Sequence, residues 1–188
     1  MSFNIVETGF YGLRVIEASI FNDDRGYFFE SFNKKKLSDI GFKFEFVQDN
    51  VSKSKKGVLR GLHYQINPMS QTKLISVLSG KILDVAVDLR RNSPTFGKCF
   101  SLELSSDDGR MILIPRGFAH GFVVLTADTV ILYKCDQYYS PEHERGIIFN
   151  DPDLNISWKI PETDLIIAKR DLSFPTFSKA EMNFFFEV

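Results

Sequence analysis

The chain has 188 residues, 44% hydrophobic and 14% aromatic, which is enough for one well-buried core and short for two ordinary domains. A net charge of −1 with scattered lysines provides no field that would hold a phosphate polymer, so we expect no nucleic-acid partner. Because no apolar run approaches the roughly 20 residues of a membrane helix and no secretion signal precedes residue 8, we expect a single cytoplasmic domain over residues 1–188 with no membrane partner.

The first predicted elements are a short helix over residues 33–39 and a strand over residues 42–47, where FKFEFV alternates with a period of two. Residues 73–78 and 81–88 also have strand character, and the Ser79-Gly80 pair between them predicts a β-hairpin. Later strands are expected at residues 99–104, 110–114, 121–125 and 129–133, with a second short helix near 161–168.

Such close spacing of short strands favours an antiparallel sandwich or barrel and disfavours alternating strand–helix units. The two cysteines, Cys99 and Cys135, are isolated in apolar strand contexts, which predicts buried free thiols. The aromatic tail at residues 184–186 is unusual for an exposed terminus, and we expect it to pack on a partner or on a sheet edge.

Two of the three histidines lie in short motifs within predicted strands. His63 belongs to residues 57–65 (GVLRGLHYQ), and His120 belongs to residues 115–122 (PRGFAHGF). Because a strand fixes the direction of its side chains by alternation, both imidazoles can face one cavity if the two strands belong to one barrel.

The second motif resembles a metal-binding signature of the cupins, a family of double-stranded β-barrels. The first cupin signature needs a His-x-His pair followed by a glutamate, whereas this chain has Gln65 in place of the second histidine. Two visible ligands are too few for a transition-metal site, so we predict no metal.

Nucleophilic catalysis has little support, because no Gly-x-Ser-x-Gly elbow exists and neither cysteine is next to a histidine. Acid–base chemistry without a metal has all its components, since a neutral histidine can remove a proton that a separate acid returns. The candidates are His63 as base, Tyr133 or Tyr139 as acid, Lys73 and Arg60 as cations, and Asp171 or Asp84 to orient an imidazole.

Beyond these two motifs, the chain resembles the dTDP-4-dehydrorhamnose 3,5-epimerases along nearly its whole length. The shared segments appear in the family's order at residues 24–32, 47–52, 57–65, 71–73, 84–90, 93–97, 115–122, 133–135, 139–142 and 151–153. The resemblance implies a cupin-type double-stranded β-helix, an all-β jelly-roll barrel with a few short helices, that works without a cofactor. It also implies inversion of carbons 3 and 5 of dTDP-4-keto-6-deoxy-D-glucose through enolate intermediates.

The same resemblance implies the catalytic roles. His63 matches the family's base and Tyr133 its acid, Lys73 is a natural cation for the enolate, and Asp171 would set the tautomer of His63. Tyr139 matches an aromatic residue that lies against the substrate.

The family also implies a nucleotide pocket shared between two subunits of a homodimer. One subunit would contribute Arg25, Phe28 and Glu30, and the other Gln48, Asn50, Arg60 and His120. Asp84, in an apolar stretch, is expected to pair with Lys73 or His63 and to line the substrate site, because an unpaired carboxylate there would be costly.

Three other functions remain open on the sequence. A single-site epimerase could share every catalytic motif, and a non-catalytic cupin could keep the sugar-nucleotide pocket without turnover. A metal-dependent cupin enzyme is the most distant of the three. Retention of both His63 and Tyr133 favours the double epimerase, since binding alone needs no acid and base on opposite faces.

Overall fold

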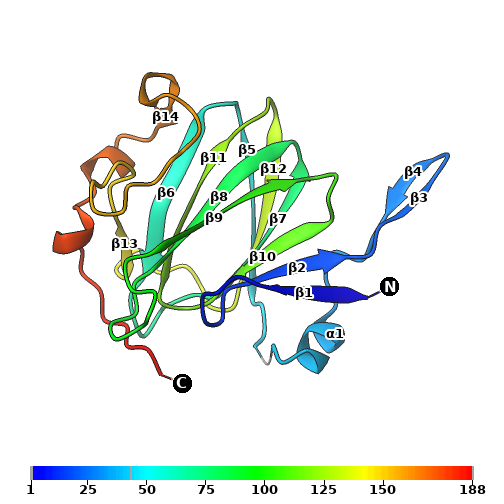
Figure 1. Cartoon of the computed structure of the whole chain (residues 1–188), viewed down its shortest axis with the longest axis horizontal. Coiled ribbons are helices and arrows are strands. Elements are labelled where there is room, and N and C mark those ends of the chain that lie inside the picture. Colours follow the sequence, from blue (N-terminus) through cyan, green and yellow to red (C-terminus); the bar gives the residue numbers. More distant parts are fainter. Residues whose placement is uncertain (1, 43, 188) are drawn as a thin grey trace.

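The computed structural model describes residues 2–42 and 44–187 and has two β-sheets that face each other (Figure 1). In spatial order the first sheet contains β1 (Phe3–Glu7), β2 (Arg14–Ala18), β10 (Arg110–Ile114), β7 (Lys73–Ser79), β12 (Thr129–Cys135) and β5 (Gln48–Ser54). The second contains β13 (Glu144–Gly146), β6 (Val58–Gln65), β11 (Phe118–Val124), β8 (Lys81–Asp88) and β9 (Cys99–Ser105), with β14 (Ile166–Ile167) parallel to β6.

Strands that follow one another in the chain mostly alternate between the two sheets. The chain passes from β5 to β6, from β7 to β8, and from β10 through β11 and β12 to β13, changing sheet at each step. All pairings except that of β14 are antiparallel. The predicted all-β jelly-roll class is thus confirmed. None of the helices within residues 2–42 and 44–187 is long and apolar enough to cross a bilayer.

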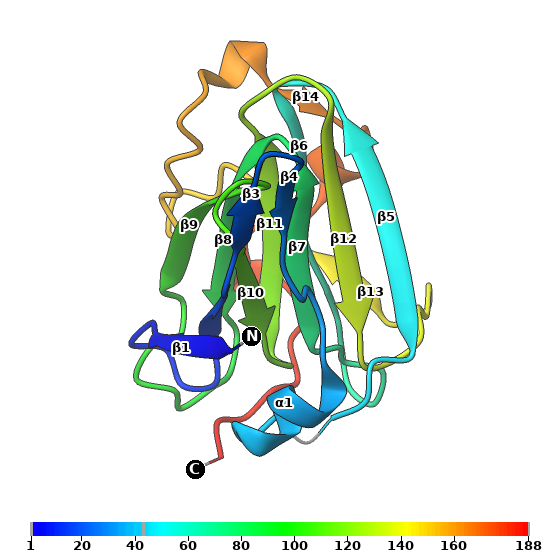
Figure 2. The same ribbon diagram turned by 90° about the vertical axis from the view of Figure 1, so that its right-hand side faces the viewer.

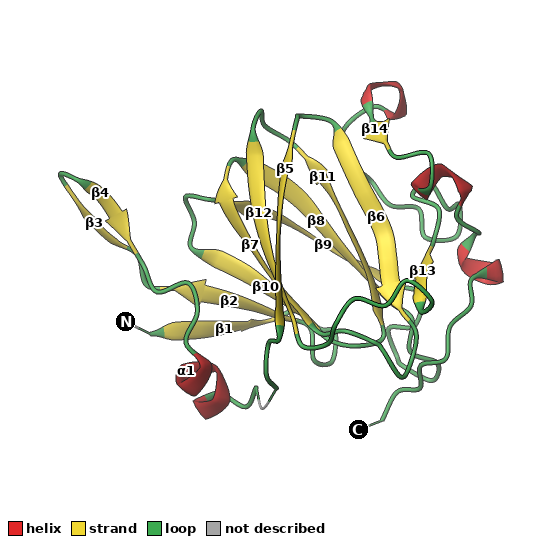
Figure 3. Ribbon diagram, turned by 180° about the vertical axis from the view of Figure 1, so that it is seen from behind, coloured by secondary structure: helices red, strands yellow, loops and turns green. Residues whose placement is uncertain are grey.

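Strand β8 is buried on both faces, which explains why its sequence is almost continuously apolar. Ile82 and Ala86 point into the cluster between the sheets, and Leu83, Val85 and Val87 point into a second cluster on the outer side. The segment after β13, which includes Trp158 and Phe149, covers this outer cluster, and Figure 3 shows it running along the side of β6. The second sheet is therefore a rigid wall held from both sides.

The strand expected over residues 42–47 is wrong. The ladder starts six residues later, at Gln48, and β5 then forms an edge of the first sheet (Figure 2). Phe44 and Phe46 instead pack with Phe32 and Phe42 near Leu37 of α1 (Lys34–Asp39). Aromatic contacts therefore account for the alternation of these residues. Lys43, which belongs to the expected strand, lies outside the described residues.

The hairpin expected from residues 73–88 is also wrong, although both strands exist. β7 pairs with β10 and β12, whereas β8 pairs with β11 and β9 in the other sheet. The turn at Gly80, with φ +82°, carries the chain from one sheet to the other. Consecutive strands here belong to opposite walls of the barrel.

The remaining predicted elements differ in how well they hold. The helix at residues 33–39 is confirmed as α1, whose first turn is capped by Asn33, and the strands at 99–104, 110–114, 121–125 and 129–133 are confirmed as β9 to β12. The helix near 161–168 is wrong, because that segment holds a three-residue 3₁₀ turn (Glu162–Asp164) and then β14. Within the described residues both cysteines are free thiols, with Cys135 buried and Cys99 half-buried.

The aromatic tail packs on the chain's own barrel. Phe184 is 4% exposed and lies against the ring of Tyr64, whose hydroxyl donates to the carbonyl of Glu181 at 2.6 Å. The backbone of residues 184–186 bonds with Arg91 just after β8. The tail thus joins the ends of β6 and β8.

Candidate functional site

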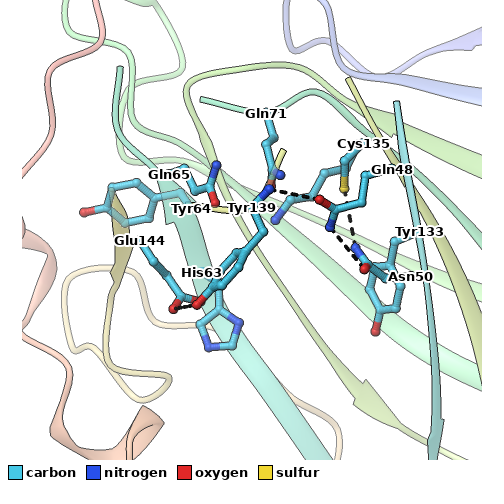
Figure 4. Close-up of a pocket in the computed structure, with 11 residues that line it drawn as sticks. Gln48, Asn50, His63, Tyr64, Gln65, Gln71, Tyr133, Cys135, Tyr139 and Glu144 are labelled. Carbon is cyan, nitrogen blue, oxygen red and sulfur yellow. Dashed lines mark hydrogen bonds between the residues drawn. The ribbon is translucent and has the colours of Figure 1, made fainter. Parts of the chain in front are cut away.

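Two adjoining hollows between the sheets form the candidate active site, and four residues line both of them. A concave site with a few convergent polar side chains is the usual form of a small-molecule site, and both hollows have such a lining. The shared lining residues are Asn50, His63, Lys73 and Tyr133. In Figure 4 Tyr133 and Asn50 stand on one side of the first hollow, while His63, Tyr139 and Glu144 stand on the other.

A β-bulge in β6 places Arg60 and His63 on the same cavity wall, although their positions differ by three, an odd number that would put them on opposite faces of a regular strand. Arg60 pairs with Phe122 of β11 and His63 pairs with His120, so β6 carries one more residue than its partner between these two pairs. Gly61 lies in the bulge with φ +130°, where a Cβ would collide with the backbone of Gly121. Glycine at position 61 is therefore a backbone requirement of the site.

His63 is held by a carboxylate from the far end of the chain. Its Nε2 lies 3.0 Å from Oδ1 of Asp171, and the amide of Gly61 donates to Oδ2 of the same carboxylate at 3.2 Å. Burial raises the pKa of Asp171, but the hydrogen bonds and charge of His63, Gly61 and Arg170 outweigh it and leave the pKa below its ordinary value. A carboxylate 3.0 Å from Nε2 favours the tautomer that carries its proton on that nitrogen, in which Nδ1 is the unprotonated atom.

A second histidine–carboxylate pair lies in the wall of the second hollow, which His120 lines. Nε2 of His120 is 2.8 Å from Oδ2 of Asp84, and both side chains are buried. Asp84 is thus paired as its apolar surroundings require, but with His120, so the expected pairing with Lys73 or His63 is wrong. The pairing follows from the register, because Asp84 of β8 lies opposite Phe122, two residues from His120 on the same face.

Tyr133 of β12 reaches the cavity between the sheets. Its ring packs edge-on against His120 at 6.5 Å and tilted against Phe122 at 6.1 Å, and its hydroxyl is 2.9 Å from Oγ of Ser52. Burial raises the pKa of Tyr133 to about 12, more than Ser52 and Arg60 lower it. The phenol therefore keeps its proton at neutral pH and is available as an acid.

Lys73 of β7 stands beside the cavity, directly across the ladder from Cys135. Burial lowers the pKa of Lys73, although Cys135, Glu144 and Asp84 act in the opposite direction. Within the described part of the chain, its ammonium has no hydrogen bond or ion pair. A half-buried amine without a partner can stabilise a negative charge that develops in the cavity.

Tyr139 forms part of the cavity rim and is anchored at both ends. Its hydroxyl donates to Oε2 of Glu144 at 2.8 Å, and its backbone amide donates to Oε1 of Gln48 at 2.9 Å. Glu144 also binds Nη1 of Arg170 at 2.8 Å, which ties the rim to the segment that carries Asp171. The rim aromatic and the partner of His63 are thus parts of one connected network.

Three predicted site residues lie elsewhere. Arg25 and Phe28 are on the hairpin of β3 (Phe21–Asp23) and β4 (Gly26–Phe28), which projects from the barrel in Figure 1, and Phe28 is 63% exposed. Glu30 accepts from Asn33 and forms an ion pair with Lys36. The other ten predicted residues line the cavity or pair with a residue that does: His63, Tyr133, Asp171, Lys73, Gln48, Asn50, Arg60, Asp84, His120 and Tyr139.

The donor set of the cavity does not fit a metal ion. No group of three or more possible ligands among His, Cys, Asp and Glu gathers anywhere in residues 2–42 and 44–187. Gln65, where a metal-binding cupin has a second histidine, instead donates to the carbonyl oxygens of Met69 and Tyr138.

Sequence reasoning missed several cavity residues. Arg170 directly precedes Asp171 in the chain, and Gln71 lies two residues before Lys73; each of the two lines one of the hollows. Ser52, which lines neither hollow but contacts Tyr133, follows Asn50 at a spacing of two, so the alternation of β5 predicts it once the start of that strand is known.

The family of the chain follows from comparisons with known proteins. A family model described as dTDP-4-dehydrorhamnose 3,5-epimerase matches residues 7–179. The dTDP-4-dehydrorhamnose 3,5-epimerase of Shigella flexneri is 45% identical over 95% of this chain and 98% of its own length.

Two solved structures superpose closely on this one. The dTDP-4-dehydrorhamnose 3,5-epimerase of Elizabethkingia anophelis has a TM-score of 0.90 at 50% identity, covering 95% of this chain and 98% of its own. The dTDP-6-deoxy-D-glucose-3,5-epimerase of Legionella pneumophila, solved with dTDP-4-keto-L-rhamnose, has a TM-score of 0.90 at 46% identity and covers 94% of each chain. The chain belongs to the dTDP-4-dehydrorhamnose 3,5-epimerase family, and it is accordingly an isomerase with the cupin-type fold.

Proposed function

We propose that the cavity inverts carbons 3 and 5 of dTDP-4-keto-6-deoxy-D-glucose, with His63 as the base and Tyr133 as the acid. One observation carries this proposal: an imidazole beside Asp171 and a half-buried, protonated phenol line the same cavity from opposite sides. Inversion needs two such groups, because the proton must leave from one face of the carbon and return to the other.

The first step is proton removal by Nδ1 of His63. Carbons 3 and 5 both flank the ketone at carbon 4, so the electron pair of the broken C–H bond delocalises onto the ketone oxygen as an enolate. Asp171 stabilises the imidazolium that forms, as the carboxylate does in other histidine-based sites. The unpartnered ammonium of Lys73 is suited to the enolate oxygen.

The second step is proton return by Tyr133. The phenolic O–H bond breaks, a C–H bond forms on the opposite face with the enolate electron pair, and the ketone is restored. The phenolate and the imidazolium then exchange protons with solvent before the next carbon reacts. The composition of the sugar is unchanged, with the hydrogens at carbons 3 and 5 replaced by protons from solvent, and these two steps require no cofactor and no metal.

The nucleotide site in this proposal is completed by a second subunit. Gln48, Asn50, Arg60, Asp84, His120 and Tyr139 would contact the substrate from one barrel, and Arg25, Phe28 and Glu30 would come from the partner's projecting hairpin. The exposure of Phe28 and the position of Arg25 far from its own cavity support this arrangement, because both side chains suit a nucleotide and neither serves its own barrel. We further propose that residues 1–188 act as one domain and that the homodimer works in the cytoplasm.

Incubation with dTDP-4-keto-6-deoxy-D-glucose in deuterated water tests the function. The proposal predicts deuterium at carbons 3 and 5 with inversion at both, in the presence of a chelator as in its absence, and no exchange by His63→Ala. Label at one carbon would establish a single-site epimerase, and label at neither carbon would contradict turnover of this substrate. Exchange that a chelator abolishes would contradict the metal-free mechanism.

A further inference from the structure

Strand β5 presents a row of polar side chains to the strands that line the cavity. Asn50 contacts Cys135 with its Nδ2 3.9 Å from Sγ, Ser52 contacts the hydroxyl of Tyr133, and Ser54 accepts from Arg60 at 3.2 and 3.3 Å. Each member of the row therefore meets a different group of the site. Ser52 is the member that meets the proposed acid.

The contact of Ser52 follows from the strand register. Ser52 lies directly opposite Ile131, and Tyr133 is two residues further along β12, so the serine reaches the phenol diagonally across the ladder. Its Oγ is 2.9 Å from Oη of Tyr133, and within the described residues it is the one hydrogen-bond partner of that hydroxyl.

The chemistry of proton return decides which atom must donate. In the neutral state either hydroxyl can donate to the other. Once Tyr133 has given its proton to the sugar, the phenolate has no hydrogen left, so Ser52 can remain bonded only as a donor. In the same way, the phenolic proton is free to point at the substrate only when Ser52 donates to the phenolic oxygen.

We infer that Ser52 is a positioning residue for proton return, which it serves by donating to the oxygen of Tyr133 and stabilising the phenolate. This inference rests on the proposed function of the cavity. Ser52 would leave proton removal by His63 largely untouched, because it contacts the acid and not the base. Removal of the Ser52 hydroxyl would therefore slow inversion of the sugar carbons more than it slows exchange of their hydrogens with solvent.

The charges around Tyr133 come from several strands. Arg60 of β6 favours the phenolate, whereas Asp84 of β8 and Cys135 of β12 disfavour it, and the ring of His120 packs against the phenol from β11. A neutral substitution at Ser52 changes none of these charges. An effect on proton return is thus attributable to the lost hydrogen bond.

The test compares Ser52→Val with Ser52→Thr, which have nearly the same shape and differ by a hydroxyl. Deuterium exchange and inversion are measured in the same sample with dTDP-4-keto-6-deoxy-D-glucose. We expect Ser52→Val to slow inversion by about 10- to 100-fold, the value of a hydrogen bond to a charged group, with a much smaller loss of exchange. We expect Ser52→Thr to keep the wild-type ratio of the two rates.

Ser52→Ala removes the fewest atoms and replaces the valine variant if thermal melting shows that the latter does not fold. Ser101→Ala on the exposed side of β9 is the matched control and should leave both rates unchanged. The inference would be overturned if Ser52→Val or Ser52→Ala left the ratio of the inversion rate to the exchange rate unchanged. It would also be overturned if Ser52→Thr were as defective in inversion as Ser52→Val. Absence of both activities from the wild-type protein would overturn the proposed function itself, and this inference with it.

Discussion

Gly61 shows how one residue without a side chain shapes the site. The bulge around it turns Arg60 and His63 to the same wall, and its amide donates to Asp171, the partner of His63. The backbone therefore supplies both the direction of the base and one hydrogen bond to the group that orients it. A bulge next to an active site is a designed feature of this kind.

Replacing Gly61 with alanine should cost both stability and activity. The added methyl group would collide with Gly121 at a positive φ that alanine tolerates poorly, so we expect a loss of about 3 kcal/mol or more in the free energy of unfolding. Urea denaturation measures this loss. Gly41→Ala is the control, because Gly41 also has a positive φ but open space around it, and its cost should stay near 1 kcal/mol.

Lys73 should set the first alkaline loss of activity. Its pKa lies below the usual 10.5, whereas that of Tyr133 is about 12, so the ammonium loses its proton before the phenol does. We expect kcat/KM to decrease as the pH rises, with a midpoint lower than pH 10.5. In Lys73→Arg, whose guanidinium stays charged, this decrease should move to higher pH, and the maximum rate should be reduced.

The same group affects stability with a defined sign. Between the folded and unfolded pKa values the unfolded chain binds more protons at Lys73, so its contribution to the free energy of unfolding rises with pH across that window. For activity, an alkaline decrease in kcat/KM that occurs at the same pH in Lys73→Arg as in the wild-type protein would show that Lys73 does not control that decrease.

At the scale of elements, periodicity predicted strands better than it predicted their partners. The strands that became β7, β8, β9, β10 and β12 were found within about two residues of their bounds, because alternation and turn residues are local signals. The hairpin of β7 and β8 was wrong, because the sheet to which a strand belongs depends on distant strands. The aromatic residues at positions 42, 44 and 46 alternate as they would in a strand. Their rings instead pack on one another outside any sheet.

The candidate site divides in a similar way. The residues of the Arg60–His63 and His120 motifs were found by composition and resemblance, and the structure brings them to one cavity. The partner of Asp84 was missed, because the pairing requires the register of β8 against β11. Ser52 and Arg170 were missed, because their contacts with Tyr133 and Glu144 join residues that are distant in the sequence.

The C-terminal tail should contribute to stability through one of its two neighbouring phenylalanines. Phe184 is 4% exposed and packs on Tyr64, whereas Phe185 is 60% exposed. We expect Phe184→Ala to lower the free energy of unfolding by about 3 kcal/mol and Phe185→Ala by less than about 1 kcal/mol. Urea denaturation of both variants checks this, and equal effects would contradict packing of the tail on its own barrel.

At the scale of the whole molecule, the projecting β3–β4 hairpin argues for sites shared between subunits. A hairpin with exposed Phe21, Tyr27 and Phe28 gains little from its own barrel, whereas a partner would bury it. In a dimer with two-fold symmetry each hairpin would serve the other subunit's cavity.

Subunit complementation tests this sharing. Arg25→Ala and His63→Ala should each be weakly active or inactive alone, but a mixed dimer would contain one site with both residues intact. Co-refolding equal amounts should restore about a quarter of the wild-type activity, since half of the dimers would be mixed and each would carry one complete site of two. Failure of the mixture to exceed its parents would contradict a shared site.

The acid and base roles are tested most directly by the separation of exchange from inversion in Tyr133→Phe. With dTDP-4-keto-6-deoxy-D-glucose in deuterated water, we expect this variant to retain proton removal by His63 and to lose most of the inversion, while His63→Ala loses both. NMR of the recovered sugar measures the label and the configuration at carbons 3 and 5. Full inversion at both carbons by Tyr133→Phe would contradict the assignment of Tyr133 as the acid.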